Sequence, residues 1–129
     1  MSYATTAINR AELVTLEEMQ LEVTKNNKAH GWYDTTRTFG DDVSLLHTEV
    51  SEMYEAFRRW GVDDATGPVT GLGHQRTLPK PEGVGSEVAD VFIRLLDTCE
   101  RYGIDLRAEY ARKMAYNRTR PYRHGMKAA

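Results

Sequence analysis

The chain has 129 residues and a net charge of −2, with 40 % hydrophobic and 28 % charged residues, as in one soluble globular domain. No stretch approaches the roughly 18 consecutive apolar residues that span a membrane, and the first residues lack the pattern of a signal peptide. Because Cys99 is the only cysteine, an internal disulfide and a thiolate metal cluster are excluded, and we expect a single cytoplasmic domain over residues 1–129.

The first predicted helix starts at Thr15 and runs to about Ala29, with Gly31 as its stop. Its first residues, Thr15-Leu-Glu-Glu18, fit a capping box, in which the Thr and Glu side chains each satisfy a backbone N–H group. Apolar residues then recur at helical spacing.

Two large aromatic residues, Trp32 and Tyr33, follow this helix in a loop. Their rings either pack in the core or stack on a planar ligand, and the sequence leaves both interpretations open. If the ligand carries a nucleobase, His30 or Asn27 is placed to read its edge.

The second predicted helix runs from about Asp41 to Trp60 and is closed by Gly61. One face is an apolar stripe at helical spacing: Leu46, Val50, Met53, Phe57 and Trp60. Glu49 and Glu52 lie three residues apart, and therefore share a flank beside that stripe. Carboxylates next to a burying face are costly unless a positive charge lies between them.

Residues 62–85 are predicted to be a long irregular connection, because glycine and proline recur throughout them. Such a length is unusual in a small domain and indicates a lid, a dimer arm or disorder. The glycines do not form a phosphate loop, because no Gly-Lys-Ser/Thr follows them.

The third predicted helix spans roughly Ser86 to Tyr102, with Ser86 as its cap and Gly103 at its end. Apolar residues cover more than half of its circumference, as expected for a central helix. The remaining polar strip has spacings of three or four and consists of Glu87, Asp90, Arg94, Asp97 and Arg101. This strip is either a site or a solvent-facing ladder of ion pairs.

The fourth predicted helix has Asp105 as its N-cap and ends at about Arg118, before Pro121. Lys113 and Asn117 lie one turn apart on it, and residues 119–129 form a basic tail. The predicted fold class is therefore all-α, with four main helices and no convincing strand.

The acidic residues of the second and third helices suggest a metal site. Two helices that pack antiparallel would bring together four carboxylates, those of Glu49, Glu52, Glu87 and Asp90. Mg²⁺ prefers such hard oxygen ligands and is usually bound by a few carboxylates together with substrate phosphates. The acidic centre of this chain would bind the metal, and its basic C-terminal end would meet the phosphates. The Cys/His cluster for zinc and the Glu-x-x-His motifs for di-iron are absent from the sequence. Spacing alone favours solvated helix faces over a metal site, because exposed helices contain many such pairs.

The pattern of these acids resembles one known family. Glu49-x-x-Glu52 followed by Glu87-x-x-Asp90 is similar to the ExxE…ExxD motif of the MazG-like, all-α nucleoside triphosphate pyrophosphohydrolases. The flanking sequence around both halves agrees, and Lys113-Met-Ala-Tyr-Asn117-Arg118-x-Arg120 resembles the family's Lys…Asn…Arg ending. The resemblance covers about residues 15–125.

This resemblance implies hydrolysis of a (d)NTP between its α and β phosphates, to a monophosphate and pyrophosphate, with Mg²⁺ (or Mn²⁺ in its place). It implies that the four acids hold the metal and are catalytic. It further implies a helical bundle completed by oligomerisation, as a homodimer or a dimer of dimers. The substrate contacts expected from the resemblance and from the aromatic loop are Lys113, Asn117, Arg120, Trp32 and His30.

Two features depart from the family pattern. Thr48 replaces the first acid of the Glu-Glu pair that many relatives carry, and residues 62–85 lengthen the gap between the motif halves. Two other classes of function also fit the sequence. One is a catalytically silent helical module that binds nucleotides or proteins. The other, less favoured, is nucleic-acid binding through the basic tail, with an affinity that falls steeply with salt.

Overall fold

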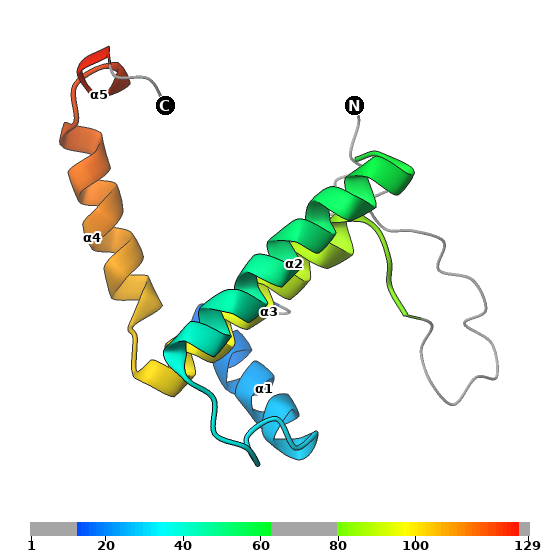
Figure 1. Ribbon diagram of the computed structural model, residues 1–129. Helices are drawn as coiled ribbons and strands as arrows, with labels where there is room; N and C mark the ends of the chain where they lie inside the picture. Colours follow the sequence, from blue (N-terminus) through cyan, green and yellow to red (C-terminus); the bar gives the residue numbers. More distant parts are fainter. Residues whose placement is uncertain (1–12, 63–79, 127–129) are drawn as a thin grey trace.

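A computed structural model describes residues 13–62 and 80–126 of the chain, with the elements labelled in Figure 1. Within these ranges the fold is all-helical, without a strand. The helices are α1 (Leu16–Ala29), α2 (Phe39–Trp60), α3 (Val84–Tyr102), α4 (Leu106–Thr119) and the short α5 (Arg123–Met126). The four predicted main helices are thus present, and α5 was not predicted. The described helices do not combine the length and apolarity that a membrane crossing requires.

Helices α2 and α3 run antiparallel, side by side, and α1 packs against α3 (Figure 1). Helix α3 is therefore central, as its wide apolar surface predicts. The buried apolar side chains among the described residues lie on α2 and α3 and are those of Ala56, Leu96 and Cys99. A hydrogen bond of 2.8 Å from Gln20 Nε2 to Glu100 Oε2 joins α1 to α3.

Local capping explains where the helices begin. The Thr15 hydroxyl accepts from Glu18 N, and the Asp105 carboxylate accepts from Ala108 N, so both predicted N-caps are confirmed. Helix α2 starts earlier than the predicted Asp41. Its N-cap is Thr38, which forms a capping box with Asp41.

The predicted start of α3 was wrong. Ser86 is not the N-cap but lies inside the helix, where its hydroxyl donates to Pro81 O at 3.2 Å. The helix begins at Val84, after Gly83, whose φ of 108° is accessible mainly to glycine. The structure describes residues 80–85 of the predicted long connection together with Val62; residues 63–79 lie outside the described ranges.

A buried carboxylate, Asp97, holds the aromatic loop against α3. It accepts a hydrogen bond of 2.7 Å from the Tyr33 hydroxyl and forms ion pairs of 3.3 Å with Arg37 and 2.8 Å with Arg101. The Arg101 guanidinium also lies over the Tyr33 ring, 3.6 Å from its centroid. Burial by itself raises the pKa of Asp97, but the hydrogen bonds from Arg101 and Tyr33 outweigh it, so the pKa is lowered.

A second buried carboxylate, Asp42, continues this network. It pairs with Arg37 at 3.2 Å and accepts a hydrogen bond of 2.7 Å from the Tyr102 hydroxyl. Through this bond the buried Asp42 side chain joins the start of α2 to the end of α3.

Helix α4 leads away from α1, α2 and α3, and α5 follows at its far end (Figure 1). None of its residues is buried. Near its start, Arg107 forms two hydrogen bonds, of 2.6 and 3.0 Å, to the carboxylate of Glu17 on α1. An isolated helix of this length is marginal in water, so α4 needs a further packing surface.

The apolar stripe predicted on α2 is only partly covered. Leu46, Met53 and Trp60 are half-buried, whereas Val50 and Phe57 remain exposed, with Phe57 at 46 %. Helix α3 likewise exposes Val88, Phe92 and Leu95. A single chain therefore leaves a large apolar surface uncovered on its two longest helices.

Candidate metal and substrate site

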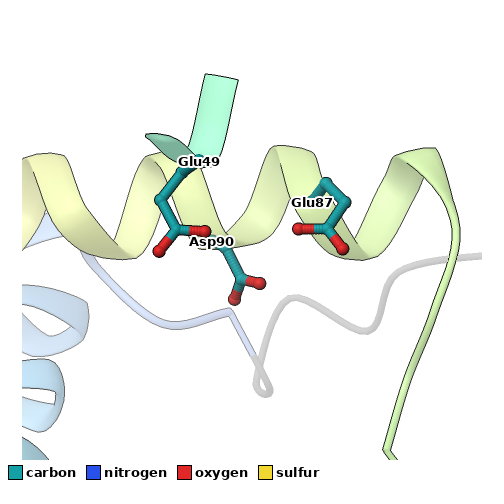
Figure 2. Close-up of side chains that lie close together, drawn as sticks. All are labelled: Glu49, Glu87 and Asp90. Atoms are coloured by element: carbon teal, nitrogen blue, oxygen red, sulfur yellow. The ribbon is translucent and has the colours of Figure 1, made fainter. Parts of the chain in front are cut away.

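Three carboxylates converge where α2 and α3 lie side by side. Glu49 of α2 and Glu87 and Asp90 of α3 each place one oxygen within 4.8 Å of the others. Figure 2 shows the three carboxylates beside α3, with Glu87 about one turn before Asp90. Glu49 lies far from Glu87 and Asp90 in the sequence, yet they meet because the helices are antiparallel and because each acid occupies a polar flank at helical spacing. Glu52, the fourth predicted acid, lies outside this group of three but close enough to interact with it.

The acids shift each other's pKa. Partial burial, with the charge of Glu49, raises the pKa of both Glu52 and Asp90. Burial, followed by the charges of Asp90 and Glu52, raises that of Glu87. The arrangement is therefore electrostatically unfavourable as it stands, and a cation bound among the carboxylates would relieve it.

One oxygen of the cluster has no hydrogen-bond partner among the described residues. Glu87 Oε2 is buried and has no hydrogen bond to any residue that the structure describes. Buried carboxylate oxygens are normally hydrogen-bonded or coordinate metals. This orphaned oxygen, together with an all-oxygen donor set, fits a hard cation such as Mg²⁺.

The carboxylates lie between two cavities. The larger, of about 380 Å³, is lined by Glu49 and Asp90 at the cluster, by the apolar Leu45 and Ile93, and further by Asn27, Trp32, Arg37, Arg94 and Asp97. The smaller, of about 160 Å³, is lined by Glu52 and Glu87 together with Lys80, Arg59 and Trp60, among others. The larger cavity thus combines carboxylates, arginines, an aromatic ring and an amide in one wall.

The structure separates the two aromatic residues of the loop. Tyr33 packs into the polar network, as described above, whereas Trp32 is 60 % exposed and lines the larger cavity. The Trp32 backbone is fixed from both sides, because its N–H donates to Asn27 O at 3.0 Å and its carbonyl accepts from Arg101 at 3.1 Å. The packing interpretation therefore holds for Tyr33, and Trp32 alone keeps a face available for stacking.

The other predicted substrate residues are not brought to this cavity. His30 is exposed, and its Nδ1 lies 2.8 Å from Asn26 O, back along its own helix. Lys113 and Asn117 are exposed on α4, which stands away from α2 and α3 in Figure 1. Arg120 is the C-cap of α4, with its guanidinium 5.8 Å from the Tyr116 ring.

Several cavity residues were not among the predicted substrate residues, namely Arg37, Arg94 and Lys80. Arg94 belongs to the polar strip that the spacing on α3 indicated, and its Nε donates to Glu49 Oε1 at 2.9 Å. No sequence signal pointed to Lys80, which precedes α3. Its charge partly opposes the rise in the pKa of Glu52, Glu87 and Asp90.

Comparisons of the chain with protein-family models, with curated proteins and with solved structures found no match.

Proposed function

We propose that the protein is a Mg²⁺-dependent nucleoside triphosphate pyrophosphohydrolase that converts a (d)NTP and water to a nucleoside monophosphate and pyrophosphate. The observation that carries this proposal is the position of Glu49 and Asp90, which belong both to the carboxylate cluster and to the wall of the larger cavity. The MazG-like pattern of the acids, ExxE followed by ExxD, supports the same reaction.

Each part of the cavity has a role in this proposal. Glu49, Glu87 and Asp90 would hold the cation, with Glu52 beside them. The chemistry that Mg²⁺ supplies to such a site, when bound, is polarisation of a phosphoryl oxygen and acidification of a water molecule. At the other end, Trp32 offers a ring on which a base can stack, and the Asn27 amide can donate to or accept from its edge.

The reaction is tested by incubating the protein with Mg²⁺ and each canonical (d)NTP, together with base-modified analogues. We expect pyrophosphate and the nucleoside monophosphate in equal amounts, without free phosphate, and no product in the presence of EDTA. Release of free phosphate instead of pyrophosphate would contradict the proposal. Binding of nucleotide without turnover, measured by calorimetry, would favour a catalytically silent nucleotide-binding module.

We further propose that a second copy of the chain completes the site. The uncovered apolar surfaces of α2 and α3 supply a contact area, and α4, with Lys113 and Asn117, projects away from its own cluster. In a dimer, these α4 residues can reach the phosphates bound by the partner subunit, where a lysine and an amide neutralise and orient them.

Light scattering after gel filtration tests this assembly. We expect a mass at least twice that of one chain for the wild type, and a shift toward the single-chain mass for Phe57→Glu, because a buried charge in the interface costs several kcal/mol. Leu21→Glu, at an exposed position of α1, is the matched control and is expected to leave the mass unchanged. A wild-type mass of one chain would overturn the proposed assembly.

A further inference from the structure

Arg94 stands between the carboxylate cluster and the larger cavity. It follows Asp90 by one turn on α3 and lines the cavity together with Trp32 and Asn27. Its Nε donates to Glu49 Oε1 at 2.9 Å, so this guanidinium neutralises one of the three converging carboxylates. A ligand in this cavity that binds at the cluster would therefore lie near Arg94.

Arg94 is held less firmly than Arg37, the other arginine of this cavity. Arg37 lies between two buried carboxylates, Asp42 and Asp97, at 3.2 and 3.3 Å. Arg94 has one carboxylate partner, its side chain is 36 % exposed, and its two terminal nitrogens donate to none of the residues described. Those nitrogens are available to another anion, so Arg94 can exchange Glu49 for a new partner when another cation takes its place.

Arg94 and a cation in the cluster would both draw on the Glu49 carboxylate. A cation held by the cluster would draw on Glu49, and the guanidinium would then lose its counter-ion. A polyphosphate bound to that cation would bring new oxygens to the same place. Guanidinium groups bind phosphate oxygens in a bidentate manner, with charge-assisted hydrogen bonds stronger than neutral ones.

We propose that Arg94 is an exchangeable counter-ion, which pairs with Glu49 in the metal-free protein and binds the phosphate chain of the substrate once a divalent cation occupies the cluster. This role rests on the proposed function, because it takes the same cluster as the metal site. Arg94 thus keeps the empty cluster from accumulating negative charge, and it contributes a phosphate contact from α3 that is independent of α4.

The test separates cation binding from phosphate binding. Mn²⁺ alone is titrated first by calorimetry, and inorganic tripolyphosphate is titrated next at saturating Mn²⁺, so that neither step depends on the base. For Arg94→Gln we expect Mn²⁺ to bind about two- to fivefold more tightly, because a competing ion pair is removed. Tripolyphosphate is expected to bind about tenfold or more weakly, because charged hydrogen bonds are lost.

Two further variants control for charge and folding. Arg94→Lys keeps the positive charge, so Mn²⁺ affinity should stay near that of the wild type, with tripolyphosphate affinity between those of the wild type and Arg94→Gln. Arg58→Gln removes an exposed arginine on α2, paired with Glu55 at 3.9 Å, and should change neither affinity. Circular dichroism establishes that each variant is helical.

The opposite signs of the two effects identify an exchangeable residue. If Arg94 only orients Glu49, Arg94→Gln binds Mn²⁺ more weakly, and the proposal is overturned; unchanged affinities overturn it as well. If the wild type binds no Mn²⁺, the cluster is not a metal site, and both the role of Arg94 and the pyrophosphohydrolase are refuted. Opposite shifts in a protein that hydrolyses none of the nucleotides would support the role of Arg94 and refute the pyrophosphohydrolase.

Discussion

Asp90→Asn is expected to lower Mg²⁺-dependent pyrophosphate release by about 10³-fold or more, without loss of the folded state. A catalytic metal contributes several kcal/mol to the reaction, and each 1.4 kcal/mol is about tenfold in rate. Asp90 belongs to both the carboxylate cluster and the cavity wall. Its replacement therefore weakens binding of the cation at the place where the phosphates would lie. The measurement is pyrophosphate release at saturating Mg²⁺, with Mn²⁺ as a second metal.

Stability separates this effect from simple unfolding. Burial and the neighbouring Glu49 raise the pKa of Asp90 in the folded protein, so this carboxylate lowers stability once the pH exceeds the raised pKa. Asp90→Asn should therefore be as stable as the metal-free wild type at neutral pH, or more stable. The stability advantage of Asp90→Asn over the metal-free wild type should grow as the pH rises through the raised pKa of Asp90, and Mg²⁺ should stabilise the wild type.

Glu22→Gln is the matched control for Asp90→Asn. It removes one negative charge from an exposed position of α1, away from both cavities, and should retain wild-type turnover. Full activity of Asp90→Asn, or an equal loss in both variants, would contradict the assignment of the cluster as the catalytic metal site.

Asp97→Asn is expected to lower the free energy of unfolding by about 3 kcal/mol or more, because it leaves buried positive charge uncompensated. The Asp97 side chain is 8 % exposed and pairs with both Arg37 and Arg101, which are themselves largely covered. An asparagine keeps the size of the side chain but offers one neutral oxygen to three donors, so the tie between α3 and the aromatic loop weakens. Urea denaturation at neutral pH measures this loss.

The pH dependence of this effect has a defined sign. The hydrogen bonds to Asp97 lower its pKa despite its burial, so its contribution is complete above the ordinary aspartate range and disappears as the pH falls through the lowered value. The wild type and Asp97→Asn should therefore differ most near neutrality and converge in acid.

Asp105→Asn is the control for Asp97→Asn, because asparagine caps a helix about as well as aspartate does. It should change the free energy of unfolding very little. If Asp97→Asn costs no more than this control, the buried network does not hold the aromatic loop in the way the structure indicates.

The sequence by itself determined those features that depend on neighbours a few residues apart. Thr15 and Asp105 cap their helices because a side-chain oxygen reaches a backbone N–H three residues later, which the order of residues reveals. The acids on α2 and α3 share flanks because of helical periodicity, so their spacing alone suggested a common site. The Ser86 cap was predicted wrongly because a glycine with positive φ starts α3 earlier.

Only the tertiary structure decided which side chains meet across the fold. Nothing in the sequence distinguishes Tyr33, fixed by Asp97 some 64 positions away, from the exposed Trp32 beside it. Likewise, the polar strip of α3 could have been a row of ion pairs exposed to solvent. In the structure, Arg94 instead pairs with Glu49 of α2, and Asp97 is buried. Ion pairs between distant positions depend on how the helices pack, and local periodicity carries no information about that packing.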